Sequence, residues 1–248
     1  MSKRDPQILA LLTSRGRVEV AELAGRLGVS TVTMRKDLDA LQAQGLVVRE
    51  HGIATLSNPN DVSGRLAYHY EEKLAIARRA AELVSDGETV MVENGSCCAL
   101  LARQIAGTKA NVTIVTNSVF IASYVRDSPG VRVTLLGGAM QPDSQVAVGP
   151  LVRTCTREFV VERLFVGADG WLDGVGFTNN DQMRAEAART MAESAAHVVV
   201  LTESEKFSQH GSVPLRLGER PLSVITDQRV PDAAREGLAR EGVAVIVA

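Results

Sequence analysis

The chain has 248 residues, of which 45% are hydrophobic and 23% charged, and its formal net charge at pH 7 is −2. This length leaves room for two ordinary domains, and the composition is that of a globular protein. No apolar run long enough for a membrane span or a secretory signal is present. The three cysteines form no disulfide or zinc pattern. We therefore expect a cytoplasmic protein with no membrane segment, no metal and no cofactor.

Charge alone does not indicate a nucleic-acid partner. Residues 1–57 carry eight Lys or Arg and six Asp or Glu, and the remainder of the chain has a net charge of −4. Any affinity for DNA must therefore come from a few well-placed cations and from the avidity of paired copies.

The predicted elements begin with a helix from Asp5 to Gly16. Asp5 is expected to cap this helix and Pro6 to occupy its first turn, where a missing N–H costs nothing. A short second helix carries Leu23 and Leu27 four residues apart on one face. These two helices are expected to share one small core with the helix that follows.

A glycine turn and a third helix complete a helix-turn-helix pattern. Gly28 supplies the turn and Ser30 is a good N-cap for the third helix. In such motifs the beginning of this helix faces base edges in the major groove. Arg35 or Lys36 is expected to bind guanine, and Val32 is expected to contact a thymine methyl group. The alternative interpretation is a solvated basic helix face.

A β-hairpin follows directly, with strands over 46–49 and 53–56 and a turn at His51-Gly52. Its basic tip suits contact with phosphate or the minor groove. The residues predicted to contact DNA are Ser30, Thr31, Val32, Thr33, Arg35, Lys36, Arg49 and His51.

The remainder of the chain alternates short apolar strands with helices. A polar turn over 57–61 is expected to separate a winged helix-turn-helix domain (residues 1–57) from an α/β domain (residues 58–248). Helices are expected over 70–84, 97–105, 119–126, near Leu151 and over 182–194. Strands are expected over 89–92, 112–115, 131–136, 164–166, 197–201, 223–226 and 243–247. This alternation predicts a mostly parallel sheet covered on both faces.

Polar or glycine-rich segments follow several of these strands. Ligands of open α/β sheets bind beyond the carboxyl ends of the strands, and free N–H groups at a helix start favour an anion. The sequence therefore predicts a pocket for a polyhydroxylated anion. The residues predicted to line it are Glu93, Asn94, Gly95, Ser96, Cys97, Thr116, Asn117, Ser118, Gly137, Gly138, Asp169, Phe177, Thr178, Arg184, Glu186 and Lys206.

Both parts of the chain resemble one protein family. Val29-Ser30, Thr33 to Leu38 and Arg49-Glu-His-Gly52 resemble the DNA-binding signature of the DeoR family of bacterial transcriptional regulators. That signature usually has a second glycine where this chain has Ile53. Asn94-Gly-Ser96, Thr116-Asn-Ser118, Leu135-Leu-Gly-Gly138, Asp169-Gly170, Gly176-Phe-Thr178 and Lys206-Phe207 resemble segments of the family's sensor domain, in the same order.

The resemblance implies a sensor of phosphorylated sugars, similar in fold to ribose-5-phosphate isomerase and glucosamine-6-phosphate deaminase. It implies that residues 95–97 and 116–118 take the phosphate, while Asp169 and Lys206 face the sugar hydroxyls. The family commonly has Gly-Thr-Thr where this chain has Gly-Ser-Cys-Cys, and thiols are weaker donors than hydroxyls. Cys97 is open to two interpretations, a reactive thiol with a lowered pKa or an inert small residue.

The function predicted from the residues and the resemblance together is a DNA-binding transcriptional repressor controlled by a phosphorylated sugar or related metabolite. Paired heads on a symmetric operator predict a homo-oligomer. One alternative is a sugar-phosphate isomerase or deaminase with a DNA-binding appendage, with Glu93, Asp169 or Glu186 as its base. Another is a structural DNA-binding protein without an effector, which leaves the polar strand ends unexplained. An NAD site is excluded because Gly174-Val-Gly176 lacks the third glycine of the dinucleotide fingerprint.

Overall fold

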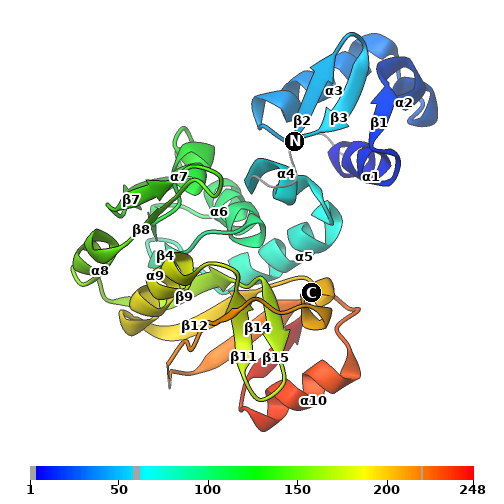
Figure 1. Cartoon of the computed structure of the whole chain (residues 1–248). Helices are drawn as coiled ribbons and strands as arrows, with labels where there is room; N and C mark the ends of the chain where they lie inside the picture. Colours follow the sequence, from blue (N-terminus) through cyan, green and yellow to red (C-terminus); the bar gives the residue numbers. More distant parts are fainter. Residues whose placement is uncertain (1–3, 58–61, 219) are drawn as a thin grey trace. The chain divides into compact units, whose positions relative to one another are not determined.

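A computed structural model describes residues 4–57, 62–218 and 220–248, and the chain forms two compact units, Met1–Glu71 (unit 1) and Glu72–Ala248 (unit 2; Figure 1). The turn predicted over 57–61 lies, apart from Ser57, outside the described residues, so a domain boundary after residue 57 stays a prediction. None of the described helices combines the length and the apolar character that a bilayer span requires.

The described part of unit 1 is a winged helix-turn-helix. Its elements are α1 (Asp5–Arg15), β1 (Arg17–Glu19), α2 (Val20–Arg26), α3 (Thr31–Ala43), β2 (Val47–Glu50), β3 (Ile53–Leu56) and α4 (Val62–Ala67). The three strands form an antiparallel sheet in the order β1-β3-β2. The fully buried core side chains include Ile8, Leu9, Leu12, Leu23, Met34, Leu38, Leu41 and Leu46. Strand β1 and helix α4 were not predicted, because three and six residues are too short to show a periodic pattern.

The sequence predicts the N-terminal caps of α1 and α3, and only one of the two is confirmed. Ser30 caps α3 as predicted, because its Oγ accepts a hydrogen bond from the N–H of Thr33 (3.1 Å). The predicted cap of α1 is wrong. The N–H of Ile8 donates to the carbonyl oxygen of Arg4 (3.0 Å), so the helix begins one residue earlier and Asp5 is its first helical residue.

The described residues of unit 2 contain a seven-stranded parallel sheet, which confirms the predicted fold class. Its order is β15 (Ala244–Val247), β14 (Leu222–Thr226), β12 (Ala195–Leu201), β9 (Val161–Gly167), β4 (Thr89–Val92), β5 (Val112–Thr116) and β6 (Val131–Leu135). The helices are α5 (Tyr70–Ala81), α6 (Ser96–Thr108), α7 (Val119–Val125), α8 (Pro150–Thr156), α9 (Gln182–Glu193), α10 (Asp232–Arg240) and the short 3-10 helix η1 (Ser204–Ser208).

Two small antiparallel sheets accompany the parallel one and were not predicted. One pairs β7 (Ala139–Gln141) with β8 (Val146–Val148), and the other joins β10 (Gly170–Leu172), β11 (Gly176–Asn179) and β13 (Val213–Pro214). Strands of two to four residues leave no readable alternation in the sequence.

The strand order determines where a ligand site belongs. The chain runs from β4 outward through β5 to β6, and then returns to β9 on the other side of β4. The order therefore reverses between β4 and β9, and in open α/β sheets ligands bind at this switch point, beyond the carboxyl ends of the strands. The segments after β4 and β9 contain Glu93 to Ser96 and Ala168 to Asp169.

Candidate functional site

Glu93 lies at the switch point, directly after β4. Its side chain is buried, and its N–H donates to the carbonyl oxygen of Phe165 in β9 (2.8 Å). Burial raises the pKa of Glu93 to about 8, against the opposing effects of the backbone N–H groups of Asn94 and Gly167 and the charge of Arg184. At neutral pH the Glu93 carboxyl group therefore carries its proton mainly and offers one O–H donor.

The predicted phosphate residues after β5 are fully buried. Ser118 caps α7 by accepting from the N–H of Ile121 (3.2 Å), and its Oγ donates to Asn94 Oδ1 (3.3 Å). Thr116 Oγ1 accepts from the N–H of Ser118 (3.0 Å), and Asn117 Nδ2 donates to a backbone carbonyl (3.1 Å). These three side chains hold the end of the strand in shape, and their direct contact with phosphate stays a prediction.

The start of α6 has no capping side chain among the described residues. Gly95 precedes the helix with φ +134°, a conformation that a side chain would strain, and Ser96 is partly exposed. Cys97 is buried, and its Sγ donates to Glu203 Oε2 (3.6 Å). Burial, followed by the charge of Glu203, raises the pKa of Cys97 well above its ordinary value. The hypothesis of a reactive thiol with a lowered pKa is therefore wrong.

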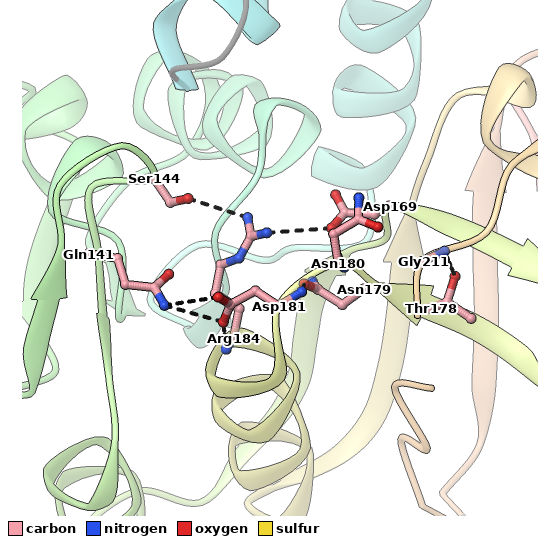
Figure 2. A network of polar contacts seen from close by, with 9 residues as sticks. All are labelled: Gln141, Ser144, Asp169, Thr178, Asn179, Asn180, Asp181, Arg184 and Gly211. Atoms are coloured by element: carbon pink, nitrogen blue, oxygen red, sulfur yellow. Dashed lines mark hydrogen bonds and ion pairs between the residues drawn. The ribbon is translucent and has the colours of Figure 1, made fainter. Parts of the chain in front are cut away.

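Arg184 is at the centre of a polar network that joins three distant segments (Figure 2). Its guanidinium group donates to Ser144 Oγ (3.4 Å) and lies 3.6 Å from Asp169 Oδ2. Asp181 caps α9 by accepting from the N–H of Arg184 (2.8 Å), and Gln141 Nε2 donates to both of its carboxylate oxygens (3.2 Å each). The side chain of Arg184 is 13% exposed, and within the described residues its Nε has no hydrogen-bond partner.

The same network fixes Asp181. Burial alone would raise the pKa of its carboxyl group, but the hydrogen bonds from Arg184 and Gln141 outweigh burial and lower it. The carboxylate therefore stays ionised and keeps the first turn of α9, with Arg184, next to Asp169. Asp169 in turn accepts from the N–H of Asn180 (2.9 Å).

Four further predicted residues make contacts within the protein. Phe177 is buried with its ring centroid 6.3 Å from that of Phe207. Thr178 Oγ1 accepts from the N–H of Gly211 (2.8 Å). A Cβ atom on Gly138 would lie 2.7 Å from the carbonyl oxygen of Val148, so this glycine permits close backbone packing. Glu186 is exposed and pairs with Arg153 (3.4 Å).

A buried ion pair beside the site was not predicted from the sequence. Lys73 Nζ lies 3.4 Å from Glu203 Oε1, and the two side chains are 3% and 10% exposed. Burial opposes ionisation of Glu203, but Lys73 outweighs it and holds the pKa of the carboxyl group below its ordinary value. A signal was available in the sequence, since Lys73 stands four residues before Ala77 on the buried face of α5.

In unit 1 the predicted DNA-facing residues at the start of α3 are exposed. Thr31, Val32, Arg35 and Lys36 all face solvent. Thr31 and Arg35 also line a surface cavity of about 320 Å³ together with His51, Gly52 and residues 19–21. The recognition helix and the hairpin turn thus border one depression.

The hairpin turn has the conformation that its sequence predicts. His51 and Gly52 have φ values of +49° and +82°, as a two-residue turn with both central residues in the left-handed region requires. Ile53, where the family usually has a second glycine, lies in β3 and pairs with Glu19 and Glu50. A glycine is not needed at that position.

Arg49 is held by contacts with α3. Its guanidinium group donates to the carbonyl oxygen of Arg35 (3.3 Å) and pairs with Asp39 Oδ1 (2.7 Å). Arg49 therefore links strand β2 to α3, and its contact with phosphate stays a prediction. The Thr33 and Ser30 hydroxyls hydrogen-bond to each other (3.0 Å) at the start of α3.

Comparison with known proteins covers both units. Residues 4–60 match the DeoR-like helix-turn-helix domain, and residues 68–228 match the DeoR C terminal sensor domain. A putative aga operon transcriptional repressor of Escherichia coli O157:H7 is 31% identical over 99% of this chain and 93% of its own length. The repressor GlcR of Bacillus subtilis is 28% identical over 97% of this chain and 93% of its own.

A likeness to solved structures is weaker. Ribose 5-phosphate isomerase A from Methanocaldococcus jannaschii aligns with a TM-score of 0.42 and 19% identity over 56% of this chain and 54% of its own. The sequence relatives, by contrast, are named as regulators of transcription and not as enzymes. The chain belongs to the DeoR family and is a DNA-binding transcriptional regulator with a C-terminal sensor domain.

Proposed function

We propose that this regulator is a repressor whose binding to its operator is controlled by a phosphorylated sugar or a related metabolite. The observation that carries the effector part is Arg184, a mostly buried cation with an unsatisfied Nε at the switch point of the sheet. Beside it, Glu93 offers an O–H donor, and among the described residues no side chain caps the first N–H groups of α6. Several relatives have "repressor" in their names, among them the lactose phosphotransferase system repressor of Lactococcus lactis.

The proposed mechanism is a linkage between two sites. The effector binds one state of unit 2 more tightly and thereby shifts the population of states that hold paired heads at operator spacing. Paired heads require a homo-oligomer, because one weakly basic head neutralises few phosphates. The protein acts in the cytoplasm, where operator and metabolite are both present.

Phosphorylated sugars are expected to raise the melting temperature of the full chain, while the matching free sugars leave it unchanged. A ligand at about 100 times its dissociation constant adds roughly 2.7 kcal/mol of stability. The measurement is a thermal-shift panel, with Arg184→Met as the variant that loses the response. Equal stabilisation by a free sugar would contradict the phosphate part of the proposal, and a flat panel would contradict the effector class.

Arg35→Ala is expected to weaken binding to a duplex that the full chain selects from a random pool by about 1–3 kcal/mol, because a bidentate contact to guanine is lost. The measurement is a mobility shift with the selected duplex and a scrambled one. Arg126→Ala is the matched control, since this exposed arginine lies in unit 2 and its loss changes net charge equally. Retention of sequence preference by Arg35→Ala would contradict the assignment of α3 as the reading helix.

A further inference from the structure

The start of α3 presents an apolar side chain where solubility alone would favour a polar one. Val32 is 74% exposed, the most exposed large hydrophobic side chain in the described part of unit 1, where Val48 on the hairpin follows with 41%. Burying such a side chain is favourable only when a partner covers it. The position of Val32 on the helix indicates which partner that is.

Val32 lies on the side of α3 that faces away from the core, and we call this side the crest of the helix. At about 100° per residue, it stands about 180° around the helix from the buried Leu41. Arg35 and Lys36 flank the crest, about 60° to one side and 40° to the other. The exposed face of α3 thus has an apolar side chain between two cations. A matching partner is anionic along the sides of a groove and has an apolar group at the bottom of that groove.

Asp39 lies further along the same crest, where its negative charge would repel DNA. The ion pair with Arg49 (2.7 Å) removes that charge without a contribution from DNA. With Asp39 paired to Arg49 of the hairpin, this face of α3 has cations on both sides and no unpaired negative charge between them. A purely apolar protein surface would leave the two cations without partners, whereas a DNA major groove has phosphates along its sides and base edges at its floor.

We propose that Val32 determines operator sequence by packing its two methyl groups against the C5-methyl of one thymine in the major groove. The thymine methyl is the apolar group on the major-groove edges of the four base pairs. A β-branched side chain in a helix has one strongly preferred χ1 rotamer, so the two methyl groups are held in place before DNA binds. This inference rests on the proposed role of α3 in reading DNA.

The test uses a duplex that the full chain selects from a random pool. Each thymine is replaced in turn by deoxyuridine, which removes the methyl group and keeps every hydrogen-bonding atom. One position is expected to cost about fourfold in affinity, the effect of losing one buried methyl group. Val32→Ser is expected to bind the thymine and deoxyuridine duplexes at that position equally. Val48→Ser, the matched control on the hairpin, is expected to keep the fourfold preference.

The salt dependence of DNA binding distinguishes an apolar contact from an electrostatic one. Val32→Ser is expected to leave the salt dependence of binding unchanged, whereas Lys36→Ala reduces the slope by about one. Binding that is insensitive to deoxyuridine at every position, or a deoxyuridine effect that persists in Val32→Ser, would overturn the proposal for Val32 alone. Failure of the pool to enrich any sequence would instead contradict the proposed sequence-specific function and the thymine contact with it.

Discussion

Replacing Lys73 by methionine is expected to destabilise unit 2 by about 3–5 kcal/mol. The side chain of Lys73 is 3% exposed and its ammonium lies 3.4 Å from Glu203. Methionine fills a similar volume but leaves the Glu203 carboxylate buried without its cation. The desolvation cost of that charge then loses its largest compensation. A backbone hydrogen bond, the charge of Lys206 and the weakly donating thiol of Cys97 have smaller effects.

The measurement is urea unfolding followed by the fluorescence of Trp171, the one tryptophan of the chain, which is buried in unit 2. Adding Glu203→Gln to Lys73→Met is expected to recover much of the lost stability, because the second change removes the unpaired charge. The matched control is Arg229→Ala, whose guanidinium group pairs with Glu72 (2.8 Å) but is 61% exposed, and which should cost less than about 1 kcal/mol. A loss for Lys73→Met no larger than that of the control would contradict the buried ion pair.

The sequence predicted the large elements well because their hydrophobic periods are long enough to read. The stripe of Met34, Leu38 and Leu41 defines one face of α3, and continuous apolar segments such as Val112–Thr116 define the strands of the parallel sheet. The short strands β7, β8 and β10 have no such pattern. They are held by pairing with neighbours, which a single sequence does not reveal.

The sequence indicates at which edge of the sheet a site would lie but not how its side chains are arranged. The sequence names residues at the carboxyl ends of the strands, which a parallel topology alone brings to one edge of the sheet. The direction of each side chain depends on contacts with distant segments. Ser144 and Gln141 reach α9 across about forty residues of chain, and Lys73 meets Glu203 across a still longer separation. Arg49 shows the same limit in unit 1, where its residue type indicates a phosphate contact and its ion pair with Asp39 could not be read from the sequence.

Glu93 is expected to make unit 2 less stable as the pH rises from about 4.5 to 8. In the unfolded chain its carboxyl group ionises near its ordinary value of 4.5, whereas burial raises the pKa in the folded state to about 8. Between these values the folded protein binds more protons than the unfolded one, so the free energy of unfolding falls with pH. Each pH unit costs at most about 1.4 kcal/mol, and the total reaches up to about 5 kcal/mol above pH 8.

Glu93→Gln isolates this effect, because glutamine has nearly the shape of the protonated acid and does not titrate. Urea unfolding of both proteins between pH 5 and 9, followed by Trp171 fluorescence, should show a stability difference that is small at pH 5, grows in favour of the variant up to about pH 8 and is constant above it. The carboxyl groups with lowered pKa values, Asp181, Glu203 and Asp227, act in both proteins at lower pH and cancel in the difference. A difference that stays constant with pH would show that Glu93 is ionised in the folded protein, and the O–H donor proposed for the effector site would then be absent.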